Sequence, residues 1–111
     1  MPHNARPVHE LKANLFRVLG HPARVRVLEL LRDGERSVGA LQAELGLDSG
    51  GTSQHLAALR RIGLVTGRRE GTSVFYSVED PRVFDLLATG RELITRRLAD
   101  QQSLLHELES E

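Results

Sequence analysis

The stretch from Asp48 to Leu64, DSGGTSQHLAALRRIGL, carries the side chains whose types and spacing suggest a chemistry. At about 100° per residue, a helix over this stretch has one apolar side, formed by Thr52, Leu56, Leu59 and Gly63. Its other side carries Gln54, Ala58 and Arg61, with Ser53 and His55 on the flanks. An amide can bond adenine through two hydrogen bonds, a guanidinium suits guanine or phosphate, and small residues let a duplex approach. The outer face therefore predicts contact with DNA.

A second short helix must hold this one in place. The segment VGALQAEL follows Ser37, a good N-cap residue, and ends at Gly46, before a link through Leu47 and Asp48. Two short helices joined by a glycine-containing turn are typical of a helix-turn-helix. Small helical proteins also use such a corner only for packing, so this pattern alone leaves both interpretations open.

The next segment favours DNA binding. Short β-favouring runs at Leu64 to Thr66 and at Val74 to Val78 enclose the polar segment GRREGT, which has two glycines at hairpin positions. A basic β-hairpin directly after a recognition helix predicts a wing.

The runs SVGALQAELGL, TSQHLAALRRIGLV and GRREGTSVFYSV together resemble the ArsR/SmtB family of winged-helix transcriptional regulators. The resemblance extends from Leu11 to Leu98, and its most specific part is S-Q-H-L-x-x-L-R-x-x-G-L-V followed by R-x-G-x-x-x-x-Y. It implies a homodimeric, sequence-specific DNA-binding regulator that reads a pseudo-palindromic operator. We expect this regulator to be a repressor. The DNA-binding residues expected from it are Ser53, Gln54, His55, Arg60, Arg61, Arg68, Arg69, Gly71 and Thr72. His55 has a second interpretation, as a residue that packs the helix.

The fold expected is mainly α with a small β-hairpin, a winged helix-turn-helix. Residues 1–7 are expected to form a flexible arm, and residues 8–111 a single DNA-binding and dimerisation domain. Apolar spacing predicts a first helix over Val8 to Leu19, a second from Pro22 to Gly34, and a long last helix that starts at Asp80 and Pro81. The resemblance implies dimerisation through the first and last helices, at Leu11, Leu15, Leu87, Ile94, Leu98 and Leu105. Packing of these stripes within one chain is the alternative.

Composition bounds the function further. The chain has 111 residues and no net charge, but residues 1–72 hold 11 basic and 7 acidic side chains, whereas residues 73–111 hold 4 and 8. The basic part therefore contains the expected reading head. The chain has no apolar run of about 18 residues and no signal-peptide pattern at its start, so a cytoplasmic protein is expected.

No set of residues in the sequence supports catalysis, so an enzyme is not expected. The serines have no convincing His and Asp companions, and the step Gly50-Gly51 lacks the ending of a phosphate-binding loop.

The effector is the least constrained expectation. Cysteine is absent, which excludes thiolate metal sites and thiol redox sensing. The resembling family's metal ligands are also missing, because Ser37 or Val38 and Gly39 replace its C-x-C step. Of the four positions of its last-helix site, Asp80, Arg82, Leu93 and Arg96, only the first can ligate.

Of the five histidines, His55 belongs to the reading head and His21 to the entry of the second helix, which leaves His3, His9 and His106 as candidate ligands. Nitrogen and oxygen ligands suit nickel, cobalt or zinc, and some members of the resembling family use an N-terminal histidine. We therefore expect a Ni²⁺ effector, or Co²⁺ or Zn²⁺, although no cofactor follows from the residues alone. Three alternatives stay open: solvated surface imidazoles, a metal-independent regulator, and a winged-helix module that docks a protein co-regulator.

Overall fold

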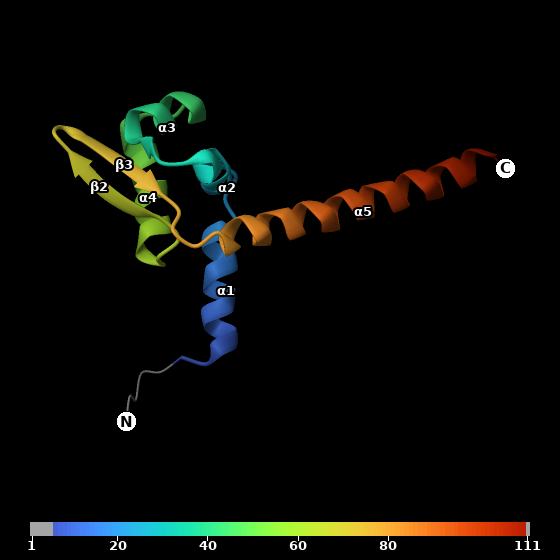
Figure 1. The fold of residues 1–111 in the computed structure, drawn as a ribbon. Helices are drawn as coiled ribbons and strands as arrows, with labels where there is room; N and C mark the ends of the chain where they lie inside the picture. Colours follow the sequence, from blue (N-terminus) through green and yellow to red (C-terminus); the bar gives the residue numbers. More distant parts are fainter. Residues whose placement is uncertain (1–5, 111) are drawn as a thin grey trace. The chain divides into compact units, whose positions relative to one another are not determined.

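The computed structural model describes residues 6–110, so His3, a predicted metal ligand, and most of the expected arm lie outside the described residues. The elements in chain order are α1 (Val8–Leu19), α2 (Pro22–Leu30), the 3₁₀ helix η1 (Leu31–Asp33), β1 (Arg36–Ser37), α3 (Val38–Leu45), α4 (Ser49–Arg61), β2 (Thr66–Glu70), β3 (Ser73–Ser77) and α5 (Arg82–Ser110) (Figure 1). The chain divides into two compact units, one up to Asp80 and one from Pro81 onwards. The mainly helical winged helix-turn-helix fold is confirmed, and the single domain expected over residues 8–111 is here described as two units.

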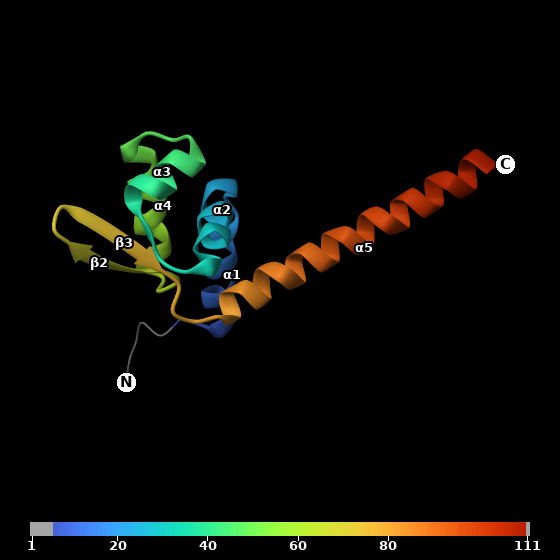
Figure 2. The ribbon, with the colours of Figure 1, turned by 45° about the horizontal axis from the view of Figure 1, so that its top comes forward.

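The first unit is built around α2, which packs against α1, α3 and α4 (Figure 2). Its largest fully buried side chains come from α2, α3, α4 and the residue before β2, and they are Val27, Leu28, Leu41, Thr52, Leu56, Leu59 and Val65. The only polar member is Thr52, whose Oγ1 donates a hydrogen bond of 2.9 Å to the carbonyl of Asp48. Its burial therefore leaves no unpaired polar atom in the core.

Side-chain caps start the helices at the places that the sequence indicated. Ser37 Oγ accepts from the backbone N–H of Ala40 at 3.1 Å, and Asp48 Oδ1 accepts from that of Gly51 at 2.7 Å. These bonds satisfy N–H groups that have no partner within the helix. Gly46 ends α3 with a φ of 65°, a left-handed conformation that glycine adopts without strain. The turn between α3 and α4 is thus fixed from both sides.

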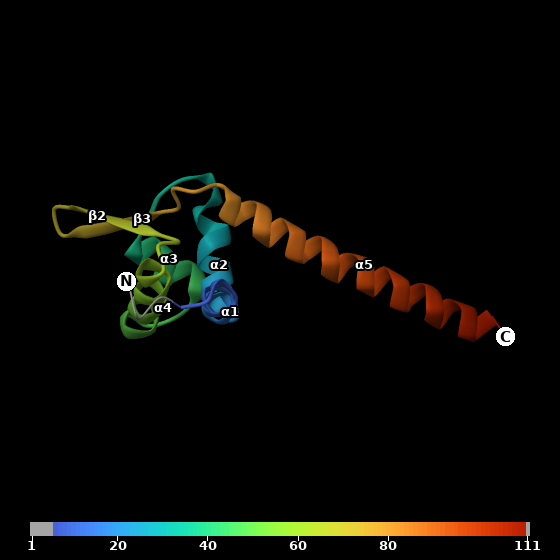
Figure 3. The same ribbon diagram turned by 90° about the horizontal axis from the view of Figure 1, so that it is seen from below.

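The wing differs in detail from the expectation. The sheet has the order β1-β3-β2 and is antiparallel throughout, and β2 runs to Glu70, so Gly67, Arg68 and Arg69 are strand residues instead of loop residues. Only Gly71 and Thr72 form the turn, because a two-residue hairpin turn matches the twist of its strands if its first residue adopts a positive φ. Gly71 does so, with a φ of 62°. In Figure 3 the hairpin reaches away from α1 and α2.

Two features could not be expected from periodicity. Strand β1 has two residues, which is too short to produce an alternating pattern. Gly67 lies inside β2, where an added Cβ would come within 3.2 Å of the Tyr76 ring. Its glycine therefore serves a close approach across the sheet and not a turn.

A cluster of polar side chains joins α2 to α4. Arg24 Nε donates to His55 Nδ1 at 3.2 Å, Arg24 Nη1 donates to the carbonyl of Val18 at 3.2 Å, and the rings of His21 and His55 have centroids 4.3 Å apart. Burial lowers the pKa of His55 first of all, and the neighbouring His21 and Arg24 lower it further. The fold therefore holds His55 as a neutral imidazole that accepts at Nδ1.

The second unit is the single long helix α5. Its large apolar side chains are highly exposed, with Leu93, Ile94, Leu98, Leu104, Leu105 and Leu108 between 55% and 68% exposed. No helix within residues 6–110 is long and apolar enough to cross a membrane. An exposed apolar stripe of this length is typical of a surface that packs against another chain.

Truncating the core at Leu41 is expected to lower the free energy of unfolding by about 2 to 5 kcal/mol, because Leu→Ala in a core leaves a cavity. Leu41 is 0% exposed, whereas Leu47, between α3 and α4, is 37% exposed. Leu47→Ala removes the same atoms and should cost much less. Urea unfolding of both variants at one protein concentration measures the difference. Equal losses would contradict the burial described above.

Acidification is expected to destabilise the protein in a window that begins at about pH 6.5, the ordinary pKa of histidine. The unfolded chain takes up a proton on His55 there, while the folded chain resists it because its pKa is lower. The stabilising contribution is therefore complete above the unfolded pKa and is lost as the pH falls to the folded pKa. Urea midpoints between pH 7.5 and 5 should fall less steeply for His55→Gln than for the wild type. His106→Gln, a change of an exposed histidine, is the control and should keep the wild-type slope.

Candidate nucleic-acid interface

The exposed face of α4 carries the residues predicted to touch DNA. Ser53, Gln54, Arg60 and Arg61 are all exposed, and no hydrogen bond or ion pair within residues 6–110 engages their side chains. The opposite face is held by Thr52, Leu56 and Leu59, which are 0%, 1% and 0% exposed. The helix therefore presents one amide and two guanidinium groups that are free to bind, on a face whose orientation the core fixes.

The expectation for Ala58 was wrong. Ala58 is 9% exposed and belongs to the core, whereas Ala57 is exposed and takes its place on the outer face. Ala58 lies next to the His55 flank, and α2 covers that flank through His21 and Arg24. The buried arc of α4 is therefore wider on this side than the apolar spacing alone indicates. Ala57 is therefore the small residue on the exposed face.

His55 is placed differently from the other predicted contacts. It is half-buried, and its ring contacts His21 while its Nδ1 is occupied by Arg24. The structure thus gives His55 the packing role that the sequence left open. Its contact with DNA stays a prediction, with only the other ring nitrogen available for it.

The wing brings the remaining predicted residues to one hairpin. Arg68, Arg69, Gly71 and Thr72 are all exposed. Arg69 makes no hydrogen bond or ion pair with any residue in the described part of the chain. Arg68 instead forms salt bridges with Glu35 and Glu70, and its Cζ lies 4.8 Å from the centroid of the Phe75 ring.

A cleft of about 460 Å³ lies between the start of α3, α4 and the tip of the hairpin. Its hydroxyl-bearing lining residues are Ser37, Ser53, Thr72, Ser73 and Tyr76. Hydroxyl groups often contact the phosphates of a bound duplex. The cleft therefore places hydroxyl groups between the exposed face of α4 and the wing.

Sequence reasoning missed Glu35 as a member of this region. Glu35 precedes β1 and lies 33 residues before Arg68, to which it is bonded. The only signal was its charge, and nothing in the spacing relates it to the wing.

The candidate metal ligands are not brought together within the described chain. His9 is an exposed residue of α1 and His106 an exposed residue of α5. Within residues 6–110, no group of three or more His, Cys, Asp or Glu side chains is arranged to hold a metal ion.

Comparison with known proteins agrees with this geometry. A family model described as a helix-turn-helix domain matches residues 19–68. The uncharacterized HTH-type transcriptional regulator Rv0081 of Mycobacterium tuberculosis is 45% identical over 103 residues, which cover 92% of this chain and 90% of that protein. Its crystal structure superposes with a TM-score of 0.80 over 87% of this chain and 98% of that chain.

Two further solved structures are similar. The transcriptional repressor BigR from Xylella fastidiosa is 33% identical, with a TM-score of 0.67 over 73% of this chain and 83% of that chain. The homodimeric winged helix-turn-helix DNA-binding domain of Mb0332 from Mycobacterium bovis, described as a possible ArsR-family transcriptional regulator, is 32% identical. Its TM-score is 0.69 over 88% of this chain and 94% of that chain.

These relatives are transcriptional regulators and not enzymes, as the sequence predicted. The superpositions cover 98% of the Rv0081 chain and 94% of the Mb0332 domain, and the latter is named a winged helix-turn-helix domain. The chain therefore belongs to the ArsR/SmtB family of winged helix-turn-helix transcriptional regulators.

Proposed function

We propose that the protein is a homodimeric repressor that binds a pseudo-palindromic operator, with α4 of each subunit in the major groove. The observation that carries this proposal is the free and exposed set Gln54, Arg60 and Arg61 on a helix whose other side is fully buried. A helix that enters a major groove needs such a set, because specificity comes from side chains that reach base edges. The relative BigR, which is named a transcriptional repressor, supports the sign of regulation.

The residues of this surface have different roles in the proposal. Gln54 and Arg61 read bases, since an amide pairs with adenine and a guanidinium with guanine. Arg60 binds a phosphate, and Ser53 hydrogen-bonds at the edge of the groove. The wing contacts the duplex beside it through its basic strand and through the turn at Gly71 and Thr72.

The dimer in this proposal forms through the apolar faces of α1 and α5. Leu11 is 54% exposed in the single chain, and Ile94, Leu98 and Leu105 are 62%, 58% and 55% exposed, while Leu15 and Leu87 are half-buried. Exposed leucine and isoleucine at helical spacing suit a two-fold contact between identical surfaces. The homodimeric Mb0332 domain supports this assembly. Two recognition helices related by a two-fold axis would read the two halves of the operator.

Removing the amide of Gln54 is expected to relax sequence specificity, because each lost bidentate base contact costs about 1 to 3 kcal/mol of discrimination. Gln54→Ala should bind the operator more weakly and a mixed-sequence duplex almost as well as the wild type does. Fluorescence anisotropy with the protein's own upstream region and with a mixed duplex gives both values.

The control for this comparison is Gln42→Ala, which removes an amide from α3 outside the exposed face of α4. It should leave the ratio of the two affinities unchanged. An unchanged ratio for Gln54→Ala would exclude Gln54 from base recognition.

A charge at Ile94 is expected to abolish the dimer, because an unpaired charge that is buried in an interface costs several kcal/mol. Sedimentation velocity should show Ile94→Asp as a monomer. Ser103→Asp, which adds the same charge on the far side of α5, should stay dimeric. A monomeric wild type, or a dimeric Ile94→Asp, would contradict the interface.

The finer part of the proposal is a nickel effector bound by nitrogen and oxygen ligands. It is supported by the absence of cysteine, which leaves imidazoles and carboxylates as ligands, and by His9 on α1 and His106 on α5, the two helices of the proposed dimer contact. His3 would be the third ligand. A metal held across the two subunits would change DNA affinity by favouring one spacing of the recognition helices.

Calorimetry tests this proposal. Wild-type protein titrated with NiCl₂ is expected to bind more tightly than about 0.1 mM. The double variant His3→Ala/His9→Ala should bind nickel far more weakly. The variant His21→Ala, which removes a histidine of the packed cluster, is the control for nickel bound weakly by imidazoles outside the proposed site. Equal affinities for the wild type and the double variant would leave a metal-independent regulator.

A further inference from the structure

The two adjacent arginines of the wing lie in different environments. In the β2–β3 register, Arg68 is opposite Phe75 and Arg69 is opposite Val74. Residues opposite each other share a face of a sheet, and neighbours along a strand point to opposite faces. Val74 lines the cleft that also contains Ser53 of α4. Arg69 is therefore on the cleft face of the wing, and Arg68 is on the other face.

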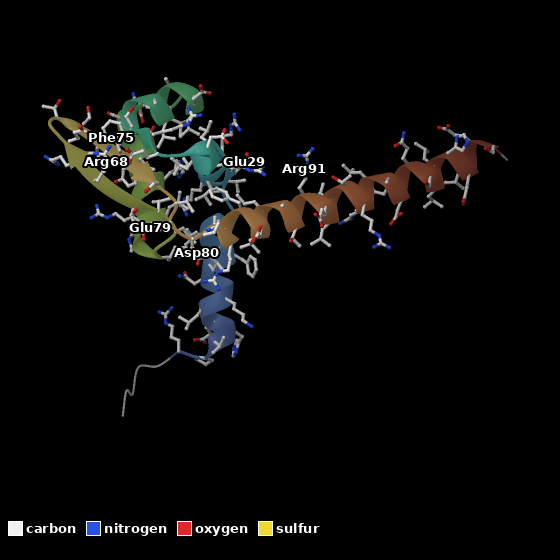
Figure 4. The ribbon with its side chains drawn as sticks, viewed as in Figure 1. Glu29, Arg68, Phe75, Glu79, Asp80 and Arg91 are labelled. Carbon is white, nitrogen blue, oxygen red and sulfur yellow. The ribbon has the colours of Figure 1, made fainter. Side chains whose placement is uncertain are left out.

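Arg68 uses most of its guanidinium within the protein. Its Nε donates to Glu35 Oε2 at 2.9 Å and to Oε1 at 3.2 Å, its Nη2 also donates to Glu35 Oε1, and its Nη1 donates to Glu70 Oε2 at 2.8 Å. The same group lies over the Phe75 ring (Figure 4). All three nitrogens of the guanidinium thus donate hydrogen bonds, and one face of the planar group is covered.

This arrangement differs from an ordinary surface ion pair. Single exposed pairs contribute little, but a two-pronged arginine–carboxylate contact within a network is the exception. The hydrogen bonds from Arg68 lower the pKa of Glu35, and the hydrogen bonds to Glu35 and Glu70 raise the pKa of Arg68, so the contact favours the charged forms of Glu35 and Arg68. Glu35 lies between Gly34 and β1, and β1 leads directly into α3. The contact therefore ties the wing to the segment that leads into the helix-turn-helix.

The charges of the network disfavour a phosphate on this face. Glu35 and Glu70 carry two negative charges and Arg68 one positive charge, so an approaching phosphate meets a net negative group. Arg69 forms no ion pair with a carboxylate of the described residues. It is an exposed cation on the face that adjoins α4.

We propose that the two arginines divide the work of the wing: Arg68 is a positioning residue that fixes the hairpin through Glu35, and Arg69 is the cation that contacts DNA phosphate. This inference rests on the proposed DNA-binding function. It differs from the expectation that both arginines contact DNA.

Arg68→Ala and Arg69→Ala form a matched pair, since each removes one guanidinium from neighbouring positions. Affinity for a mixed-sequence duplex is measured over a range of salt concentrations. The slope of log K against log salt is negative, and each lost phosphate contact reduces its magnitude by about 0.9. Arg69→Ala should reduce the magnitude of the slope by this amount for each wing in contact. Arg68→Ala should weaken binding severalfold and leave the slope unchanged.

A second measurement follows the hairpin without DNA. Amide hydrogen exchange reports local opening of β2 and β3. Arg68→Ala and Glu35→Ala should each speed this exchange severalfold, and the double variant should add little, because both changes break the same contact. Arg69→Ala should exchange as the wild type does. Circular dichroism confirms that each variant is folded.

The outcomes separate this inference from the proposed function. A slope whose magnitude falls equally for both arginine variants, or exchange that is unchanged in Arg68→Ala and Glu35→Ala, would overturn the division of roles. A wild type that binds no duplex would overturn the proposed function and the role of Arg69. In that case the exchange data still decide whether Arg68 and Glu35 hold the wing.

Discussion

The complete burial of one side of α4 is the constraint on which the rest of the reading head depends. Leu56 and Leu59 hold the helix against the core, and Thr52 joins them because its hydroxyl bonds to the carbonyl of Asp48 in its own first turn. This packing fixes the rotation of the helix about its axis. Ser53 and Ala57 therefore face outward together, and a long side chain such as Arg61 starts from a rigid base. Sites built on helices whose rotation is fixed are more precise than sites on loops.

Local signals in the sequence were sufficient for the helices and for the fold class, although not for the short strand β1. Ser37 and Asp48 cap their helices, Pro22 begins α2, and Gly46 ends α3, because each of these residues satisfies or terminates a helix through its own chemistry. The same kind of reasoning failed for Ala58. Its burial depends on the side chains of α2 that cover the His55 flank, and Arg24 lies 31 residues before His55. A helical wheel contains no information about such a neighbour.

In the proposed function, the two units have different roles. The first unit, up to Asp80, contains every residue of the proposed DNA surface, and α5 contains most of the exposed apolar surface. A small domain with one core gains stability and symmetry together when such a surface is covered by a second copy. In the proposed dimer, the apolar stripe therefore both protects α5 from water and sets the distance between the two recognition helices. Its length could be predicted from the sequence, whereas the spacing of apolar residues alone does not identify the partner that covers it.

The wing shows why a motif alone does not distinguish the roles of two neighbouring residues. The dipeptide Arg68-Arg69 gives no reason to prefer either side chain, because a shift of one residue in the strand exchanges their faces. The turn decides the outcome. Gly71, with its positive φ, allows a two-residue turn, and this turn places Arg68 opposite Phe75 and Arg69 opposite Val74. A longer turn, as expected from the polar run GRREGT, would have left both arginines in a loop without fixed faces. In the proposed division of roles, Gly71 therefore also acts indirectly, because its turn determines which arginine lies on the face of the wing that adjoins α4.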